Sequence, residues 1–408
     1  MQSRDPARPA PMGPILGDRR LFSTLRYEIY ANHAGISPPS RPVVQALTDV
    51  GEDYAARAFA AWPTYNDQRT SLRQRLARML CVDSEDLGFT SNTTQGVIDI
   101  ALSVAWKPGD RVVVFAGEFP ANVTPWQSAA KTFSLELEML SLEPFARSAQ
   151  EGLDALERAL SKGVRLVAVS AVQFQTGLRM PLEAMAALVH RYGGELFVDA
   201  VQACGIIPLN LRALAVDYLA CGSHKWLMGT EGAGFVYVHP DKIAKLVPRV
   251  AGWLSHEEPV RFLLEGAGHL RYDRPIRART DFIEGGNLPT PSLAALEASV
   301  KLLEDLTIDR IFAHTTQYLD ALEPQLTALG FHSMRSTDRD LQSGSLCLRP
   351  PQHISLEALH RGLLREHIAT AMPDGFLRIS PHWPNAMREV PTLVQAVRDV
   401  MRTLESAP

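Results

Sequence analysis

Short apolar runs that alternate with helix-period segments restrict the possible folds of this chain more than any other feature. The runs are RVVVF at 111–115, VRLVAVS at 164–170, ELFVD at 195–199, DYLAC at 217–221 and GFVYV at 234–238. Helices are predicted around them at about 67–80, 93–105, 152–161 and 181–192. A short run that is apolar on both faces is typical of a buried strand. Strands that alternate with helices indicate an α/β fold with a largely parallel sheet covered on both sides.

The pattern changes near residue 255. Residues 255–290 are rich in Arg, Gly and Pro and predict loops. Beyond them, helices are predicted at about 292–304, 308–328 and 391–404, and strands at 344–349 and 376–380. We therefore expect a large domain over 61–290 and a smaller α+β domain over 291–408. Residues 21–60 should pack with the small domain, and residues 1–20 should form a mobile arm.

Composition excludes several classes of function. The net charge is −4 and the pI is about 6.3, so the chain has no basic footprint for nucleic acid or an anionic membrane. No apolar run reaches the ~18 residues that a membrane helix needs. The four cysteines are scattered, without the spacing of a metal site or a disulfide framework, and the N-terminus has no apolar signal region. We expect a cytoplasmic protein without a metal.

Polar and aromatic residues follow the predicted strands, where open α/β sheets place their ligands. Asn92, Thr93 and Thr94 stand at a strand-to-helix transition, which is an anion site or a plain helix cap. Phe119 follows the run at 111–115 and either stacks on a planar ring or packs in the core. Each signal by itself is weak.

Two further strand ends carry ionisable residues. Asp199 ends a strongly apolar strand, so its carboxylate needs a cationic partner or caps the next helix; Gln202 follows in the same turn. Lys225 lies in CGSHKWLMGTEGAG, between apolar flanks, where an ammonium is costly unless it is paired or neutral. A lysine of this kind is suited to form a Schiff base. Its alternative is an ordinary loop lysine.

One ligand accounts for all four strand ends. Pyridoxal phosphate (PLP) has a phosphate, a flat ring, a basic ring nitrogen and an aldehyde that condenses with lysine. The segments VDAVQACGIIPLNL and GSHKWLMGTEGAG resemble the aspartate-glutamine strand and the lysine loop of fold type I PLP enzymes of the class V aminotransferase family. This family includes cysteine desulfurases, kynureninase and isopenicillin N epimerase. The resemblance runs from YEIYANHAGISPPS near residue 27 to LRISPHWPN near 385.

The resemblance implies a seven-stranded-type sheet and a role for each matching residue. Lys225 would be the catalytic lysine that carries PLP, Asp199 would pair with the ring nitrogen, Gln202 would face the ring oxygen, and Phe119 would stack on the ring. The implied phosphate ligands are Thr93, Thr94, Ser223, His224 and, in a homodimer, Asn287 from EGGNLP at 284–289.

The implied substrate is a small molecule, a free α-amino acid. Arg378 would bind its carboxylate, and Asn32 and His33 would lie at the mouth of the site. Two departures from the family pattern are Gly222, where a serine is frequent, and Phe174, where an asparagine is frequent. The span REHIATAMPDGFLR, which carries the nucleophilic cysteine in desulfurases, contains no cysteine here. A persulfide-forming desulfurase is therefore not expected.

The reaction type stays open at this point. An aminotransferase is the first expectation; a β-lyase of the C–S lyase or kynureninase type, or an amino-acid epimerase, is the alternative. An epimerase needs a second proton donor, for which the candidates are His33, Tyr65, Trp253, His256 and His382. Lys225, Asp199 and Arg378 together argue against a PLP-type fold with only a regulatory or sugar-binding role.

Overall fold

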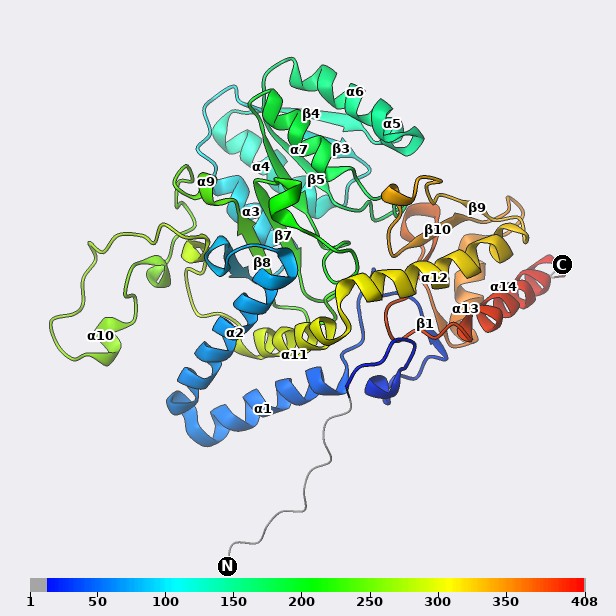
Figure 1. Ribbon diagram of the computed structural model, residues 1–408, viewed down its shortest axis with the longest axis horizontal. Helices are drawn as coiled ribbons and strands as arrows, with labels where there is room; N and C mark the ends of the chain where they lie inside the picture. Colours follow the sequence, from blue (N-terminus) through cyan, green and yellow to red (C-terminus); the bar gives the residue numbers. More distant parts are fainter. Residues whose placement is uncertain (1–12, 407–408) are drawn as a thin grey trace, which may run out of the picture.

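The computed structural model describes residues 13–406 and is built around a seven-stranded sheet (Figure 1). The strand order is β2-β8-β7-β6-β5-β3-β4. The strands span Leu87–Thr90 (β2), Arg111–Ala116 (β3), Glu136–Ser141 (β4), Val164–Ser170 (β5), Glu195–Asp199 (β6), Tyr218–Gly222 (β7) and Gly234–Val238 (β8). β8 is antiparallel to both of its neighbours, and the other neighbouring strands are parallel. The prediction of a mostly parallel sheet is confirmed.

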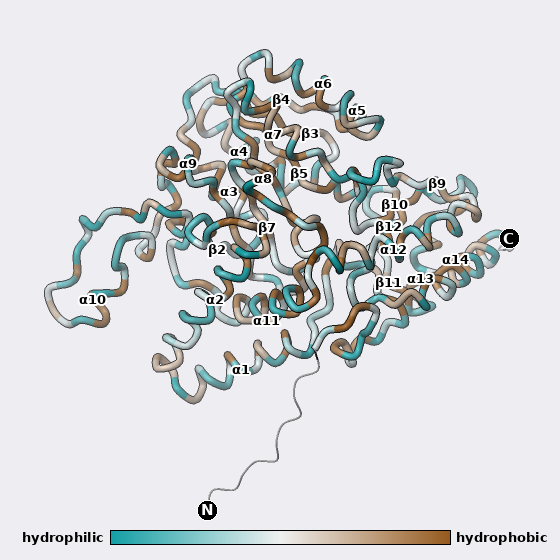
Figure 2. The backbone as a smooth tube through the Cα atoms, in the orientation of Figure 1, coloured by the Kyte–Doolittle hydropathy of each residue, from teal (hydrophilic) through white to brown (hydrophobic). Residues whose placement is uncertain are grey.

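Helices cover both faces of this sheet. Along β3, Val112 and Val114 pack with α3 and α4, whereas Val113 and Phe115 belong to the cluster on the other face, with α2, α6, α7 and α11. These helices span Trp62–Leu80 (α2), Thr93–Ser103 (α3), Thr124–Phe133 (α4), Ala149–Leu160 (α6), Leu182–Arg191 (α7) and Thr290–Leu306 (α11). Figure 2 shows the central strands largely in brown. Burial on both faces explains why the strands appear in the sequence as unbroken apolar runs.

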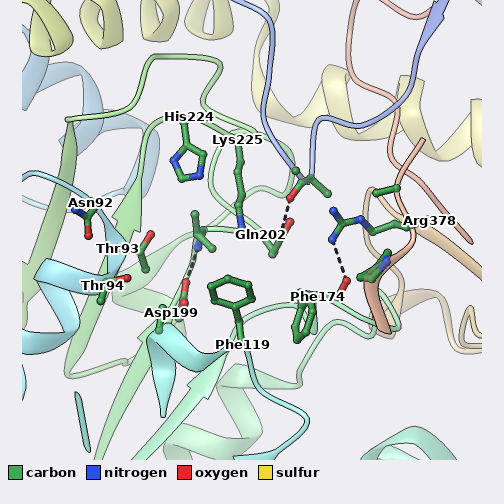
Figure 3. A pocket seen from close by; sticks show the side chains of 16 residues that line it. Asn92, Thr93, Thr94, Phe119, Phe174, Asp199, Gln202, His224, Lys225 and Arg378 are labelled. Carbon is green, nitrogen blue, oxygen red and sulfur yellow. Dashed lines mark hydrogen bonds between the residues drawn. The ribbon is translucent and has the colours of Figure 1, made fainter. Parts of the chain in front are cut away.

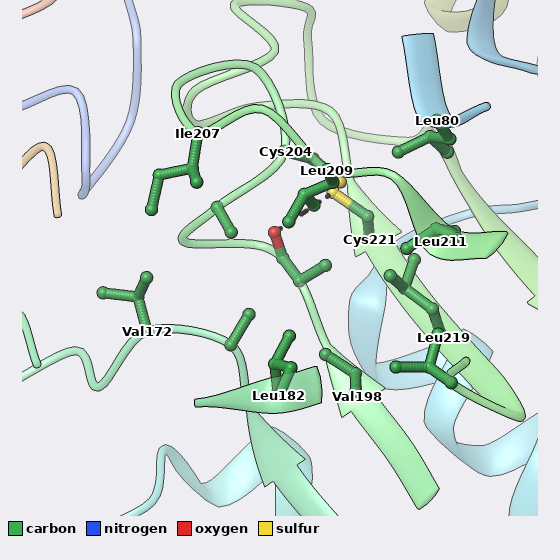
Figure 4. Packing of buried hydrophobic residues seen from close by; sticks show 14 of the residues in the cluster. Leu80, Val172, Leu182, Val198, Cys204, Ile207, Leu209, Leu211, Leu219 and Cys221 are labelled. Carbon is green, nitrogen blue, oxygen red and sulfur yellow. Dashed lines mark hydrogen bonds between the residues drawn. The ribbon is translucent and has the colours of Figure 1, made fainter. Parts of the chain in front are cut away.

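The face covered by α2, α6, α7 and α11 also contains two cysteines. Figure 4 shows Cys204 and Cys221 among aliphatic side chains, close to Leu209. Cys221 is fully buried and Cys204 is 2 % exposed. Both thiols therefore act as small apolar core groups.

A second group of elements forms two smaller sheets. β12-β10-β9 is an antiparallel three-stranded sheet, and β1 pairs in parallel with β11. The strands span Ile29–Tyr30 (β1), His332–Ser333 (β9), Leu346–Arg349 (β10), Ile368–Ala369 (β11) and Leu377–Ile379 (β12), and the helices span Ile308–Thr327 (α12), Leu356–Arg365 (α13) and Glu389–Glu405 (α14). They share one hydrophobic cluster. From the sequence, we expected these elements in a small domain that begins at residue 291. That boundary falls at the start of α11 (Thr290–Leu306), which packs with the large sheet.

The remaining helices are α1 (Arg41–Arg57), α5 (Glu143–Arg147), α8 (Leu211–Leu214), α9 (Pro240–Ile243) and α10 (Arg261–Leu264). The segment around α10, predicted as loops, stands out from the body at the left of Figure 1. The predicted mobile arm falls mostly outside the described residues. Within the described part, the Gly17 N–H donates to the Trp383 carbonyl at 2.7 Å. In residues 13–406, no helix has the length and apolarity that a membrane crossing requires.

Candidate active site

The carboxyl ends of β2, β3, β5, β6 and β7 meet at one edge of the large sheet and open into a cavity of about 560 Å³ (Figure 3). The residues that line it are Ala34, Gly35, Asn92, Thr93, Thr94, Phe119, Ala121, Phe174, Asp199, Val201, Gln202, His224, Lys225, Ala371, Pro373 and Arg378. The strand ends singled out in the sequence thus converge on one site, which residues from the second group of elements close on one side.

Lys225 lies in the turn after β7, and its side chain extends across the cavity toward Phe119 (Figure 3). The ammonium nitrogen Nζ lies 5.4 Å from the centroid of the Phe119 ring. Within residues 13–406 this nitrogen has no hydrogen bond or ion pair. Burial lowers the pKa of Lys225 to about 8, although Asp199 acts in the opposite direction. The amine is therefore far easier to deprotonate than an exposed lysine.

Asp199 ends β6 at the floor of the cavity. One carboxylate oxygen, Oδ1, accepts the Val201 N–H at 2.9 Å, and the other has no protein donor among the described residues. Burial raises the pKa of Asp199 to about 6. Gln202, in the following turn, donates from Nε2 to the Ala34 carbonyl at 3.0 Å and accepts from the Trp226 ring nitrogen at 2.8 Å. Gln202 is thus fixed, with its second amide hydrogen still available.

The start of α3 forms one end of the cavity (Figure 3). Asn92 is the helix cap, because its side-chain oxygen accepts the Gln95 N–H at 2.9 Å. Thr93 Oγ1 accepts the Gly222 N–H at 2.9 Å, which joins α3 to the lysine turn. A Cβ atom on Gly222 would lie only 3.0 Å from Thr93 Oγ1, so the glycine allows this close approach. The Thr94 hydroxyl and the free N–H groups of the helix start make this end suitable for an anion.

The side of the cavity toward the smaller sheets carries Arg378, from β12. Its Nη1 donates to the Phe174 carbonyl at 3.0 Å, and its Nε has no hydrogen-bond partner. The side chain is 6 % exposed, and burial lowers its pKa. Phe174 packs edge-on against Phe119, with ring centroids 5.3 Å apart. Because a guanidinium stays charged, Arg378 offers a fixed cation to an incoming anion.

Comparison with known proteins identifies the family. The family model for aminotransferase class-V matches residues 29–372, well over half of the chain. The chain belongs to the class V aminotransferase family. Members of this family depend on PLP and include aminotransferases and related lyases and epimerases.

Two relatives and one solved structure illustrate the range of the family. A probable cysteine desulfurase of Methanothermobacter thermautotrophicus is 25 % identical over 411 residues, which covers 94 % of this chain and 97 % of the relative. Isopenicillin N epimerase of Streptomyces clavuligerus is 26 % identical over 341 residues, or 80 % and 82 % of the two chains. A C-DES mutant with glycine covalently linked to its PLP cofactor has a TM-score of 0.85 at 23 % identity and covers 94 % and 99 %. The predicted fold type I architecture is confirmed.

The cavity of this class V chain fits PLP, because several polar groups in it have no partner within the protein and match the functional groups of the cofactor. The free oxygen of Asp199 suits a protonated ring nitrogen, Lys225 Nζ suits an aldehyde, and the start of α3 at Thr93 suits a phosphate. Arg378, which lines the cavity, then remains for a carboxylate on the substrate. Each orphan group matches one functional group of the cofactor or of an amino acid.

Three sequence expectations do not match the positions of the side chains. Ser223 is fully buried and its hydroxyl donates to the Thr230 carbonyl, so it does not face the cavity as a phosphate ligand. His33 is 1 % exposed and bonds Ser37 Oγ at 2.8 Å; neither it nor Asn32 lines the cavity. The next two residues, Ala34 and Gly35, line it instead.

Asn287 is exposed and lies in a different depression, beside the end of β2. It does not line the cavity of its own chain.

None of the other proposed proton donors lines the cavity of the described chain. His382 is fully buried behind the lysine turn, where Nε2 donates to the Trp226 carbonyl at 2.8 Å and Nδ1 accepts the Trp383 N–H. Tyr65 donates to the Asp49 carbonyl at 3.2 Å. Trp253 and His256 belong to the segment that leads to α10. These side chains support the fold and leave Lys225 and His224 as the basic nitrogens of the cavity that can release or take up a proton.

Sequence reasoning passed over Glu118, which precedes Phe119. It is 7 % exposed and is surrounded by donors from the end of β5. The sequence feature that could have pointed to Glu118 is its position next to Phe119, the expected stacking residue.

Proposed function

We propose that this chain cleaves a bond at the β-carbon of a free α-amino acid by PLP-dependent elimination, as a C–S lyase does. The observation that carries the proposal is the presence of one amine, Lys225, and one guanidinium, Arg378, on opposite sides of a cavity whose other walls are mainly apolar. This arrangement provides one base and one carboxylate site. The likeness of the chain to C-DES, a cystine C–S lyase, concerns the fold alone.

The residues that hold PLP in this proposal are those predicted from the sequence, except Ser223. Asp199 pairs with the ring nitrogen, Phe119 stacks on the ring, and Gln202 directs its free amide hydrogen at the ring oxygen. Thr93, Thr94 and His224 hold the phosphate at the start of α3. When bound, PLP withdraws electrons from the Cα of an amino acid joined to it, so that a substituent can leave.

The chain then supplies orientation and proton transfer. Arg378 fixes the α-carboxylate through its planar guanidinium, which sets the position of Cα. Lys225, freed from the cofactor, takes the Cα proton, since a pKa near 8 lets an appreciable fraction of the amine be neutral at neutral pH. A thiolate leaving group departs with the electron pair of the C–S bond and needs no acid from the protein.

The same geometry disfavours the other reactions. A two-base epimerase needs a second donor opposite Lys225; none of the five candidates lines the cavity, and His224, which does, is proposed here as a phosphate ligand. A persulfide-forming desulfurase needs a reactive thiol, but Cys347 is fully buried opposite Arg378 in the sheet, and burial raises its pKa to about 12. Cys221 is also fully buried.

An aminotransferase is the second candidate, because a single lysine is sufficient to move a proton in transamination. A dicarboxylic amino acceptor would need a second cation for its second carboxylate. Among the described lining residues, only Arg378, Lys225 and His224 are basic. This absence supports elimination over transamination in our proposal, the reverse of the order expected from the sequence.

A half-reaction distinguishes elimination from transamination. The purified yellow enzyme is mixed with a panel of amino acids that includes cysteine, cystine and S-substituted cysteines, without any 2-oxo acid, and the spectrum and products are followed. Elimination predicts release of thiol or sulfide, ammonia and a 2-oxo acid while the visible spectrum recovers. A lasting spectral change that a 2-oxo acid reverses, without ammonia, would reject the lyase and favour the aminotransferase.

We also infer that the enzyme works as a homodimer. The exposed position of Asn287, away from the cavity of its own chain, supports a role at the phosphate of a partner subunit. Light scattering should give twice the 45.0 kDa chain mass. In addition, Asn287→Ala should weaken PLP binding. A monomer with full PLP affinity would contradict this.

A further inference from the structure

A segment from outside the large sheet lies against the turn that carries the lysine. Residues 31–40, between β1 and α1, pass between Lys225 and Arg378 in Figure 3. We call residues 31–40 the N-terminal strap. Ser380, directly after β12, donates its N–H to the Ala31 carbonyl of the strap at 2.8 Å. The strap is therefore joined to the strand that carries Arg378.

The other end of the strap reaches the backbone of the lysine turn. The Ser37 N–H donates to the His224 carbonyl at 2.8 Å, and the Ser37 hydroxyl donates to the Lys225 carbonyl at 2.7 Å. From the segment after β12, His382 Nε2 donates to the Trp226 carbonyl at 2.8 Å. Three successive carbonyls at the lysine are therefore bound by donors that lie outside the large sheet.

The Ser37 hydroxyl is itself held in one orientation. Ser37 is 4 % exposed, and its oxygen lies 2.8 Å from His33 Nδ1. Because the single hydroxyl proton is used for the Lys225 carbonyl, Nδ1 carries the proton of this second bond. Burial lowers the pKa of His33 well below its ordinary value, so the ring is neutral. His33 thus orients the Ser37 hydroxyl, which in turn binds the lysine turn.

A second route through the side chain of Trp226 closes the network. Its ring nitrogen donates to Gln202 Oε1 at 2.8 Å, and Gln202 Nε2 donates to the Ala34 carbonyl of the strap at 3.0 Å. The Ala34 N–H donates to the Ser380 hydroxyl at 3.2 Å. The strap, the lysine turn and the segment after β12 therefore form one connected set of hydrogen bonds.

We propose that Ser37 is a positioning residue for Lys225, and that its hydroxyl fixes the lysine turn so that the amine enters the cavity at a set position relative to Arg378. This rests on the proposed role of Lys225 as the amine that holds PLP and takes the Cα proton. Within the turn, the Lys225 carbonyl also accepts the Met228 N–H at 2.9 Å. That bond shapes the turn locally, whereas the strap ties the turn to the part of the fold that carries Arg378.

A fixed backbone matters here because the lysine side chain is a flexible four-carbon chain. Proton transfer requires an approach within hydrogen-bond distance. A small displacement of the turn would move Nζ away from the Cα of a substrate whose carboxylate is bound by Arg378. Loss of the Ser37 hydroxyl should therefore lower kcat, whereas KM, which reflects the Arg378 site, should change little.

The test compares Ser37→Ala with two matched variants. Ser37→Thr keeps a hydroxyl at this position and should recover part of the function. Ser40→Ala is the control, because Ser40 is also a buried serine of the strap, 2 % exposed, but its hydroxyl has no hydrogen-bond partner in the described chain. Both kcat and KM are measured with the cystine, S-substituted cysteine or other amino acid that reacts fastest in the half-reaction.

A second measurement does not use the reaction. Hydrogen–deuterium exchange of the peptide that covers residues 222–230 is followed by mass spectrometry, both in the holoenzyme and in protein freed of PLP. This peptide contains the whole lysine turn, so its exchange rate reports how firmly the turn is held. Peptides from the far edge of the sheet, at β4, serve as the internal reference.

Ser37→Ala should lower kcat about tenfold, as expected for the loss of one buried hydrogen bond, and should change KM less than about threefold. The peptide 222–230 should exchange several times faster than in the wild type, and Ser40→Ala should match the wild type in every measurement. An unchanged kcat in Ser37→Ala, or equal losses in Ser37→Ala and Ser40→Ala, would overturn the inference. A lower kcat without faster exchange would also overturn it, because Ser37 would then act by another route.

Two more variants keep the test decisive. If Ser37→Ala does not fold, Ser37→Cys replaces it with the same expectations, since a thiol is of similar size but is only a weak donor. Lys225→Ala tests the underlying assumption. Normal turnover in Lys225→Ala would contradict the proposed role of Lys225 together with this inference, whereas lost turnover in Lys225→Ala combined with an unchanged Ser37→Ala would overturn this inference alone.

Discussion

Replacing Arg378 by alanine should raise KM for amino acids by about two orders of magnitude and leave PLP binding nearly unchanged. Arg378 comes from β12, outside the large sheet, and is 6 % exposed. One of its N–H groups is used by the Phe174 carbonyl at 3.0 Å, and Nε has no partner. Arg378 lines the cavity, on the side away from Asp199 and Thr93 (Figure 3).

The magnitude follows from the bonds that a carboxylate would make there. A hydrogen bond to a charged group contributes about 1.5–3 kcal/mol. A carboxylate held by two parallel N–H groups and then deprived of both should lose about 3 kcal/mol, which corresponds to roughly 150-fold in KM. Arg378 is not among the residues proposed to hold PLP, so PLP affinity should change less than about threefold.

The assay is a titration of the visible spectrum of the holoenzyme with amino acids, alongside equilibrium dialysis of PLP. Arg378→Lys is the matched control, since it keeps the charge and loses the planar fork, and it should recover part of the affinity. Equal losses of PLP and amino-acid binding in Arg378→Ala would show that the residue only holds the two parts of the fold together. An unchanged KM would refute the assignment outright.

Two further predictions concern Lys225 and His382. Lys225→Ala should lack the visible absorbance of the wild type and should retain no PLP after borohydride reduction and denaturation; retained absorbance would show that another residue carries the cofactor. Burial lowers the pKa of His382 to about 4 from 6.5, so below pH 6.5 the unfolded chain takes up a proton that the folded chain does not. Stability present at pH 8 is therefore lost as the pH falls, and the advantage of wild type over His382→Asn in urea unfolding should shrink by about 2 kcal/mol from pH 8 to pH 5. A constant difference between the two proteins would show that His382 is not held neutral.

The sequence predicts the strands that are buried on both faces, because burial alone makes them unbroken apolar runs. It also predicts the cavity at the ends of these strands. β5 and β6 are apolar on both faces, and their predicted bounds agree with the structure. β4 was missed, because it is an edge strand whose residues Glu136–Ser141 are partly exposed and interrupted by charge. Short edge strands are not buried on both faces and therefore do not appear in the sequence as unbroken apolar runs.

The direction in which each side chain points could not be predicted from the sequence. Lys225 and Ser223 stand two residues apart in one turn, yet the lysine enters the cavity and the serine turns inward to the Thr230 carbonyl. The strand-end rule predicts which turns reach the site. Which residue of a tight turn points outward depends on local backbone geometry, and a motif does not encode it.

The division of the site between two parts of the fold limits how mutations can act. The residues proposed to hold PLP follow strands of the large sheet, whereas Arg378 belongs to β12 and reaches across to the Phe174 carbonyl. A second contact between the same parts joins Gln175 Nε2 to Asp374 Oδ2 at 2.5 Å. Because these contacts join the part of the fold that carries Arg378 to the large sheet, loosening them should impair substrate alignment before it affects cofactor binding. Substrate choice can therefore change through the segment that carries Ala371 and Pro373, while the cofactor site stays intact.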